Sequence, residues 1–393
     1  MNQQRIGKRT FIAAGVGALA LAALPLAAQQ KPPIKLGVIT ILSGPLATYG
    51  KSQELLAKMA AEDINAKGGI NGSMVQLAIE DAQLDPGQAV LMLRKLHGDG
   101  YFGAIGPVTG TQWETASPLA NQIQMPSISV NAAKPGITVK PWTIRLVPAD
   151  DTAQPAGFND FIKLHPNVKR GVILADVREA TGRSVADDFA RLAKAAGVQI
   201  VDVVEFSTRA TDLSPAAIKA KGANPDVLFV AAFAPSAVML AKEFAAQGMK
   251  VPVLASSILW PGPFINQVGE NGRNWYTWGY TTNDRTTGDK ALHESIVKRA
   301  LARADTTLGT PFNVSNWSVT YDALMLYADI LRRNGFDGSS DPKKVRETIK
   351  DEFVKLKSYS GVNRYTMRDT GDADVPTSAL VTDIDAKVWR YPK

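Results

Sequence analysis

The chain has 393 residues, 45% of them hydrophobic and 21% charged, with a formal net charge of +7. This composition is typical of globular proteins, and at about 100 to 200 residues per domain the length predicts two or three domains. The chain contains no cysteine, which excludes disulfides and thiolate metal sites, and its three histidines are far apart in the sequence, which argues against imidazole-based metal or acid–base chemistry.

Residues 1–28 are predicted to be an export signal. Three basic residues precede the apolar run 11–24, and Ala27 and Ala28 are small residues of the kind found at a cleavage point. The run is short for a membrane span, so a retained signal anchor is the less favoured alternative. Lys8-Arg9 resembles a twin-arginine motif with Lys in the first position, which leaves the ordinary secretory route open. Both routes predict a periplasmic protein without a membrane span after processing.

Short apolar runs then alternate with amphipathic stretches. Apolar residues at a spacing of three and four predict the helices, and turn residues separate them from the strands. Asp85-Pro86 is typical of a helix start, and Gly68-Gly69 of a helix end. The first half is predicted to contain strands at 34–40, 74–80 and 102–105, with helices around 55–64 and from 86 to 96.

The second half repeats this pattern. Strands are predicted at 171–175, 200–205, 227–231 and 251–254, and helices at 184–196, from Asp212 onward, at 236–247, 290–304 and 317–333. Alternating strands and helices with short loops predict doubly wound parallel sheets with helices on both faces, so the fold class is α/β with two lobes. If the late helices cover the first sheet, both lobes are discontinuous.

Enzyme motifs are absent from this α/β pattern. The glycines after the first strand do not fit the dinucleotide-binding spacing, and no phosphate-binding loop or nucleophile elbow occurs. Carboxylate pairs such as Glu80-Asp81 are interpreted as caps and solvated faces. We therefore expect neither catalysis, nor a cofactor, nor a metal. After removal of the three basic leader residues the charge of +4 is too small and dispersed to predict nucleic-acid binding.

The loop 106–113 is the most informative segment. It lies at the carboxyl end of a predicted strand, where open α/β sheets bind ligands, and it combines hydroxyl groups with a helix N-terminus. It therefore predicts a carboxylate-binding site that uses no charged side chain. Helix capping by Thr111 is the alternative interpretation.

An ordered series of segments resembles the branched-chain amino-acid-type periplasmic binding proteins of ABC importers. The series covers essentially all of residues 34–390 and consists of 34–38, 43–50, 64–72, 80–86, 105–107 and 336–350. The resemblance implies a type I periplasmic binding protein, with two lobes joined by three crossovers that close over a small ligand. The predicted lobe boundaries are 33–149 plus 281–357 for lobe 1 and 150–280 plus 358–393 for lobe 2.

The resemblance also implies site residues. The ligand-carboxylate loop falls on Gly110, Thr111 and Gln112, the first-lobe aromatic residue on Tyr49, and a crossover acid on Asp150. The next binding loop falls on Asn131, Ala132 and Ala133. In the second lobe a tyrosine of the family becomes Phe233, and the acid that pairs with the ligand ammonium becomes Ser257.

These departures weaken the expected amino-group site, because a buried ammonium needs acceptor partners. Arg178 could supply a cation for a carboxylate, and Tyr49, Trp113, Phe233 and Trp260 an aromatic wall. One hypothesis is therefore a carboxylate-bearing ligand with an apolar or aromatic body and no amine. The other is an ordinary hydrophobic amino acid held by backbone carbonyls or Asp150, with Trp113 and Trp260 only packing on the lobes.

The predicted function is the solute-binding component of an ABC transporter, which delivers its ligand to the membrane permease subunits. A ligand sensor that acts with a membrane receptor, without transport, is the alternative. The sequence does not show whether the membrane partner is a permease or a receptor.

Overall fold

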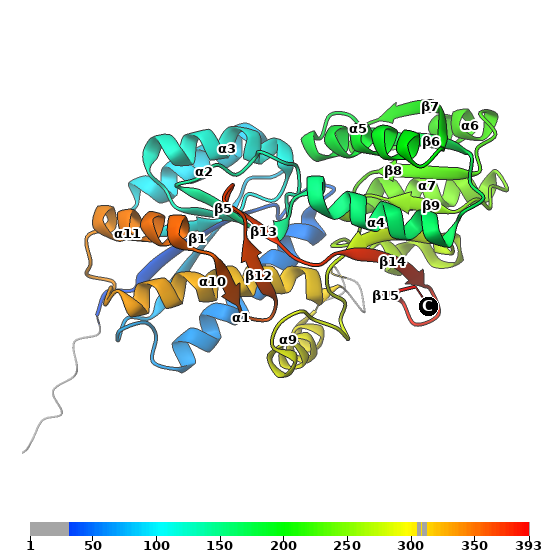
Figure 1. Ribbon diagram of the computed structural model, residues 1–393. Coiled ribbons are helices and arrows are strands. Elements are labelled where there is room, and N and C mark those ends of the chain that lie inside the picture. The colour runs from blue at the N-terminus through cyan, green and yellow to red at the C-terminus, as the bar shows by residue number, and fades with distance from the viewer. Residues whose placement is uncertain (1–30, 305–307, 309–312, 393) are drawn as a thin grey trace, which may run out of the picture. The chain divides into compact units, whose positions relative to one another are not determined.

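The computed structural model describes residues 31–304, 308 and 313–392. These residues form two mixed, mostly parallel sheets, each covered by helices (Figure 1), and we call each sheet with its helices a lobe. The predicted α/β fold class with two lobes is confirmed. The predicted export signal lies outside the described residues.

The first lobe is built on an eight-stranded sheet. Its strands are β1 (Ile34–Thr40), β2 (Val75–Asp81), β3 (Gly103–Ile105), β4 (Ser127–Ser129), β5 (Thr143–Pro148), β11 (Ser358–Ser360), β12 (Arg364–Met367) and β13 (Asp372–Asp374). They lie in the order β11-β12-β13-β5-β4-β3-β1-β2, and β1 to β5 run parallel. Strands β3, β4 and β5 are buried throughout, as parallel strands between two helix layers require.

Helices cover both faces of this sheet. They are α1 (Ala47–Ala66), α2 (Pro86–Gly98), α3 (Gly110–Ile123), α9 (Lys290–Arg303), α10 (Val314–Arg333) and α11 (Pro342–Lys355). α1 and α10 pack together on one face, and α2 and α3 pack on the other. As predicted, Gly68 and Gly69, both with positive φ, follow α1, and Asp85 caps α2 by accepting a hydrogen bond from Gln88 N at 2.9 Å.

The second lobe is built on a seven-stranded sheet. Its strands are β6 (Arg170–Asp176), β7 (Gln199–Phe206), β8 (Val227–Ala231), β9 (Val253–Ala255), β10 (Trp275–Gly279), β14 (Ser378–Asp383) and β15 (Val388–Arg390), in the order β15-β14-β10-β9-β8-β6-β7. Its helices are α4 (Asp150–Leu164), α5 (Ala180–Ala195), α6 (Ser214–Gly222), α7 (Ala234–Ala246), α8 (Phe264–Val268) and the short 3₁₀ helices η1 (Ser257–Leu259) and η2 (Gly269–Gly272).

The two helix layers of the second lobe pack through different side chains. Phe158, Phe161 and Phe189 of α4 and α5 pack on one face of the sheet, and Ala217 and Leu240 of α6 and α7 belong to the cluster on the other. Helix α5 begins at Ala180, four residues earlier than predicted.

The chain passes between the two sheets three times, from β5 to α4, from β10 to α9 and from β13 to β14. Figure 1 shows the last passage as the red segment that leads from β13 to β14. This agrees with the three crossovers that the resemblance implied.

The predicted boundary at residue 358 is wrong. Residues 358–374 were assigned to the second lobe, but β11, β12 and β13 belong to the first sheet, where β13 pairs with β5. The physical reason is a buried ion pair. Arg145 on β5 donates to Asp372 on β13 at 3.0 Å from Nε and 2.7 Å from Nη2, and both side chains are almost fully buried. The β13 strand must lie beside β5 for this charge to be paired.

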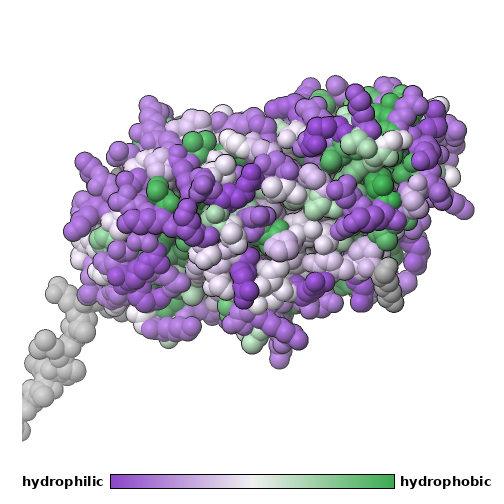
Figure 2. Space-filling model, viewed as in Figure 1, coloured by the Kyte–Doolittle hydropathy of each residue, from purple (hydrophilic) through white to green (hydrophobic). Residues whose placement is uncertain are grey.

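Large apolar side chains that remain exposed among the described residues are few and lie in different elements: Met74, Leu91, Val139, Leu164, Val203, Ile218 and Val354. Figure 2 shows a mostly hydrophilic surface on the face that it presents. No helix within the described ranges is both long enough and apolar enough to cross a bilayer.

The buried Arg145–Asp372 pair predicts a large stability effect. Arg145→Ala leaves the Asp372 carboxylate buried without its cation, so we expect the free energy of unfolding to fall by about 3 to 5 kcal/mol. Urea denaturation measures it. Lys163→Ala, which removes an exposed pair with Asp160, is the control and should change stability by less than about 1 kcal/mol. A similar effect of both variants would contradict the prediction.

Candidate functional site

The carboxyl ends of strands from both sheets meet around a cavity of about 100 Å³. First-lobe residues from the loops after β2 and β3 line one side, and second-lobe residues from the loops after β6, β7 and β8 line the other. They are Leu84, Pro86, Thr109, Thr111, Gln112, Asp176, Arg178, Glu179, Ser207, Thr208, Arg209 and Phe233. Ligands of open α/β sheets bind at this edge, so we call this cavity the cleft cavity.

Helix α3 begins at the cleft cavity with a capping box. Thr109, not Thr111, is its N-cap: the Thr109 hydroxyl accepts from Gln112 N at 3.3 Å, and Gln112 Oε1 accepts from Thr109 N at 3.3 Å. The capping interpretation of Thr111 is therefore wrong, and the Gln112 side chain is engaged in the cap and with Gln83 O. Thr111 keeps its hydroxyl and its N–H group for other partners.

Thr111 forms hydrogen bonds across the two lobes. Its N–H group donates to Glu179 Oε1 at 3.1 Å, and its hydroxyl accepts from Ala180 N at 2.9 Å. A Cβ atom on Gly110 would lie 2.4 Å from Thr181 Oγ1, so only glycine permits this close approach. The position predicted for a ligand carboxylate is thus filled by the carboxylate of Glu179. Sequence reasoning missed Glu179; its only signal was an acid just before a helix.

Two arginines line the cleft cavity. The Arg178 side chain is exposed, and no ion pair within the described ranges involves it. Arg209, which the sequence analysis did not single out, donates to Leu84 O at 3.1 Å. The carboxylate of Asp176 is engaged by Thr208 N at 2.8 Å and Arg178 N at 3.0 Å. The cavity therefore offers guanidinium groups to an anion.

Tyr49 and Phe233 fill the space beside the cleft cavity. Tyr49 is fully buried; its hydroxyl donates to Ile258 O at 2.8 Å and accepts from Ala234 N at 3.0 Å, both in the second lobe. Its ring meets Phe233 edge-on at 5.4 Å between centroids. Burial raises the pKa of Tyr49, so the hydroxyl stays protonated. The predicted aromatic residues Tyr49 and Phe233 are in contact with each other, and their contact joins the two lobes.

A second, smaller cavity of about 30 Å³ lies near the first crossover, and we call it the hinge cavity. It is lined by Asn131, Ala133, Val147, Pro148, Ala153, Ser257, Trp260, Pro261, Trp278, Gly279, Tyr280, Asn316 and Thr377. Among the described residues, the Trp260 Nε1, Tyr280 hydroxyl and Asn316 Nδ2 atoms are buried and have no hydrogen-bond partner. The indole and amide N–H groups can only donate, and the hydroxyl can donate. The hinge cavity is therefore rich in donors.

Asp150 lies beside the hinge cavity and is fully buried. Its Oδ1 accepts from the Ser257 hydroxyl at 3.2 Å, and its N–H group donates to Ala133 O at 2.8 Å. Burial raises the pKa of Asp150 to about 7, although the charge of Arg145 and contacts with Ser257 and Trp278 lower it. The carboxyl group thus faces Ser257, where the family places an acid.

Seven of the eleven predicted site residues line one of these two cavities. Thr111, Gln112, Arg178 and Phe233 line the cleft cavity, whereas Asn131, Ala133 and Ser257 line the hinge cavity.

Four of the predicted residues line neither cavity. Gly110 and Tyr49 are engaged across the lobes, as described above, and Asp150 lies behind Ser257. Ala132 serves the scaffold, because its carbonyl accepts from Arg145 Nη1 at 3.0 Å. Trp113 also belongs to the scaffold: it is fully buried and donates to Pro107 O at 2.7 Å. Trp260, in contrast, lines the hinge cavity.

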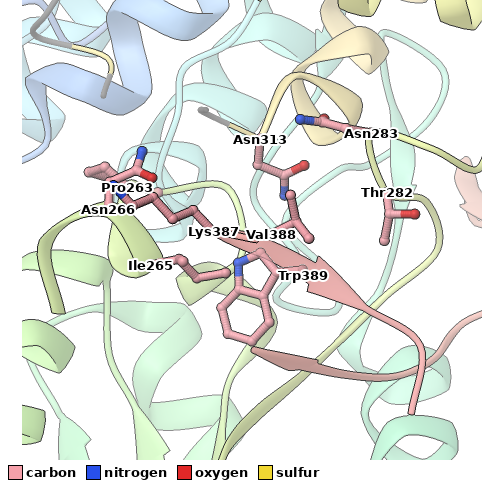
Figure 3. Close-up of a pocket in the computed structure, with 10 residues that line it drawn as sticks. Pro263, Ile265, Asn266, Thr282, Asn283, Asn313, Lys387, Val388 and Trp389 are labelled. Carbon is pink, nitrogen blue, oxygen red and sulfur yellow. The ribbon is translucent and has the colours of Figure 1, made fainter. Parts of the chain in front are cut away.

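A third cavity, also of about 30 Å³, holds none of the predicted residues. Figure 3 shows Ile265, Lys387, Val388 and Trp389 on one side of it, and Thr282, Asn283 and Asn313 on the other. None of the strand-end loops that form the cleft cavity reaches it, so it is not the candidate site. No group of His, Asp or Glu side chains among the residues that the structure describes could hold a metal ion.

Comparisons with known proteins agree with the two-lobe α/β fold. A family model described as periplasmic binding protein matches residues 33–386. The chain belongs to this family of periplasmic binding proteins, and its fold is that of the type I members. It is 25% identical to the Leu/Ile/Val-binding protein of Citrobacter freundii over 354 residues, which cover 88% of this chain and 90% of the relative.

Solved structures share the fold. A leucine-binding protein of Thermotoga maritima superposes with a TM-score of 0.78 at 19% identity, covering 91% of this chain and 98% of that chain. A solute-binding protein of R. palustris in complex with 4-hydroxybenzoate superposes with a TM-score of 0.76 at 17% identity, covering 92% and 96%. The fold therefore accommodates both an amino-acid-binding and an aromatic-acid-binding protein.

The raised pKa of Asp150 predicts a pH-dependent stability. With a pKa of about 7 when folded and 3.8 as the ordinary value, Asp150 binds its proton more tightly in the folded chain. The stability that this proton contributes is present below pH 4 and is lost as the pH rises to 7 and above. Asp150→Asn cannot titrate, so its stability relative to the wild type should rise between pH 4 and pH 8, by about 4 kcal/mol. Thermal unfolding of both proteins across this range measures the difference, and a difference independent of pH would contradict the expectation.

Proposed function

We propose that this protein is the periplasmic solute-binding component of an ABC transporter, and that it captures a carboxylate-bearing ligand with an apolar or aromatic body and no α-amino group. Family membership supports a solute-binding role without catalysis. The observation that carries the ligand class is the donor-rich hinge cavity beside Ser257.

The carboxylate of the ligand is assigned to the cleft cavity. The N-terminus of α3 presents backbone N–H groups at the cleft, of which that of Thr111 donates to Glu179, and the positive end of the helix dipole favours an anion there. Arg178 and Arg209 line the same cavity. Arginine binds carboxylates with two parallel hydrogen bonds, so an acid group has both a helix end and guanidinium partners in reach of one cavity.

The body of the ligand is assigned to the aromatic side chains. Phe233 lines the cleft cavity and lies against Tyr49. Aromatic rings bind apolar and aromatic groups through dispersion and edge-to-face contacts. Opening of the lobes breaks the hydrogen bonds of Tyr49 with Ile258 and Ala234 of the second lobe. A ligand ring that enters there replaces the contacts that Tyr49 and Phe233 make with each other.

The absence of an amine follows from the partners available. An ammonium group has only donors and needs acceptors around it. The hinge cavity instead presents unpartnered donors on Trp260, Tyr280 and Asn316, and Ser257 replaces the acid of the family. The Asp150 carboxyl accepts from Ser257 through Oδ1, its buried Oδ2 has no partner among the described residues, and burial favours the neutral form of the group. An oxygen atom of the ligand, or water, satisfies these donors better than an ammonium does.

A thermal-shift series on residues 29–393 tests the ligand class. We expect benzoate, 4-hydroxybenzoate and 4-methylpentanoate to raise the melting temperature by several degrees, because a ligand at a hundredfold excess over Kd stabilises the fold by about 2.7 kcal/mol. L-leucine, the amino-acid counterpart of 4-methylpentanoate, is expected to give no shift. A shift with L-leucine alone would overturn the amine-free class and restore an ordinary amino acid as the ligand.

Arg178 is expected to bind the ligand carboxylate. Arg178→Ala should weaken the binding of the best acid of the series by tenfold or more, because a hydrogen bond to a charged group contributes about 1.5 to 3 kcal/mol. Isothermal titration calorimetry measures the affinity. Arg191→Ala, which removes an exposed ion pair with Asp188 on α5, is the matched control and should bind as the wild type does. Equal affinities of the two variants would remove Arg178 from the site.

A further inference from the structure

We propose that Glu179 is an internal competitor of the ligand: its carboxylate occupies the N-terminus of α3 and must leave before a ligand carboxylate binds there. The identity of the displacing ligand rests on the proposed function, but the closure of the empty protein by Glu179 does not.

The geometry places one carboxylate between two helix ends. Glu179 is the N-cap of α5 in the second lobe, where its Oε1 is 3.4 Å from Thr181 N. The same oxygen accepts from Thr111 N at 3.1 Å, in the first turn of α3 in the first lobe. The Ala180 N–H group returns a hydrogen bond to the Thr111 hydroxyl at 2.9 Å. Glu179 therefore bridges the positive ends of α3 and α5.

The charge of Glu179 has no cationic side chain as its partner. Its exposed fraction is 6%, and no ion pair within the described ranges includes it. Burial and the charge of Asp176 at the end of β6 raise the pKa of Glu179, whereas its hydrogen bonds from Thr111 and Thr181 lower it. The two helix ends are thus the main source of positive potential for the carboxylate.

The site holds one carboxylate and not two. A Cβ atom on Gly110 would already lie 3.0 Å from Glu179 Oε1 and 2.4 Å from Thr181 Oγ1, so α3 and α5 are in close contact at Gly110. A ligand carboxylate at the Thr111 N–H group would also meet the negative charge of Glu179 at contact distance. Binding therefore requires the lobes to separate and Glu179 to turn away.

This competition lowers the apparent affinity for the ligand. If about 90% of the empty protein is closed by Glu179, only about a tenth is competent to bind, and the apparent Kd is about tenfold weaker than the intrinsic Kd. Glu179 then acts as a specificity determinant, because only an acid that gains enough from the rest of the cleft displaces it.

The experiment distinguishes the role of Glu179 as a competitor of the ligand from its role as the N-cap of α5. Asp is among the best N-cap residues, so Glu179→Asp keeps the cap of α5, while its side chain is one methylene too short to reach Thr111 N. Glu179→Gln keeps the length and removes the charge. Glu205→Gln, at an exposed acid on β7, is the control. Small-angle X-ray scattering of the ligand-free proteins reports opening, and calorimetry with benzoate as the probe reports affinity.

We expect both Glu179 variants to have a larger radius of gyration than the wild type without ligand, and Glu179→Asp to bind benzoate at least threefold more tightly at an unchanged melting temperature. The control should match the wild type in both measurements. Unchanged scattering, or weaker benzoate binding by Glu179→Asp, would overturn the proposal. If benzoate binds to none of the proteins, the proposed ligand class fails, and the scattering alone decides whether Glu179 closes the empty protein.

Discussion

One carboxylate joins two helix ends where the lobes meet at the cleft. Parallel strands end at the same edge of each sheet, so the helices that follow β3 and β6 begin at the cleft, and their positive ends point toward each other. Two such ends repel unless an anion lies between them. Glu179 supplies that anion from within the chain, and a ligand carboxylate is the external equivalent. Binding of an acid and closure of the lobes are therefore one electrostatic problem.

Near the first and last passages of the chain between the lobes, two buried acids have different surroundings. Arg145 and Asp372 are buried together and fix β13 beside β5, so the last passage of the chain starts from a rigid region of the first sheet. Asp150, at the first passage, is buried without a direct ion pair and is kept near neutrality by its surroundings. A paired charge stabilises one strand order, whereas the unpaired acid makes the neighbourhood of Ser257 sensitive to pH.

The proposed ligand class rests on the balance of donors and acceptors and not on the fold. Related structures carry a leucine-binding name or a bound aromatic acid on the same scaffold, so the scaffold does not select the ligand. In this chain the acceptors expected around an amine are replaced by Ser257 and by unpartnered donors of the hinge cavity. The guanidinium groups of Arg178 and Arg209 favour an acid in the cleft cavity.

The sequence alone determined the α/β class, most strands and helices and the strand-end loops of the site, because the spacing of apolar residues and the turn residues between them act locally. The resemblance in the sequence pointed to Thr111 and Arg178, and both line the cleft cavity. The tertiary structure decided what depends on distant partners: β13 joined the first sheet through Arg145, Thr111 bonded to Ala180, and Glu179 reached α3. None of these pairs is close in sequence, and burial and charge pairing between distant residues leave no local pattern by which they could be predicted.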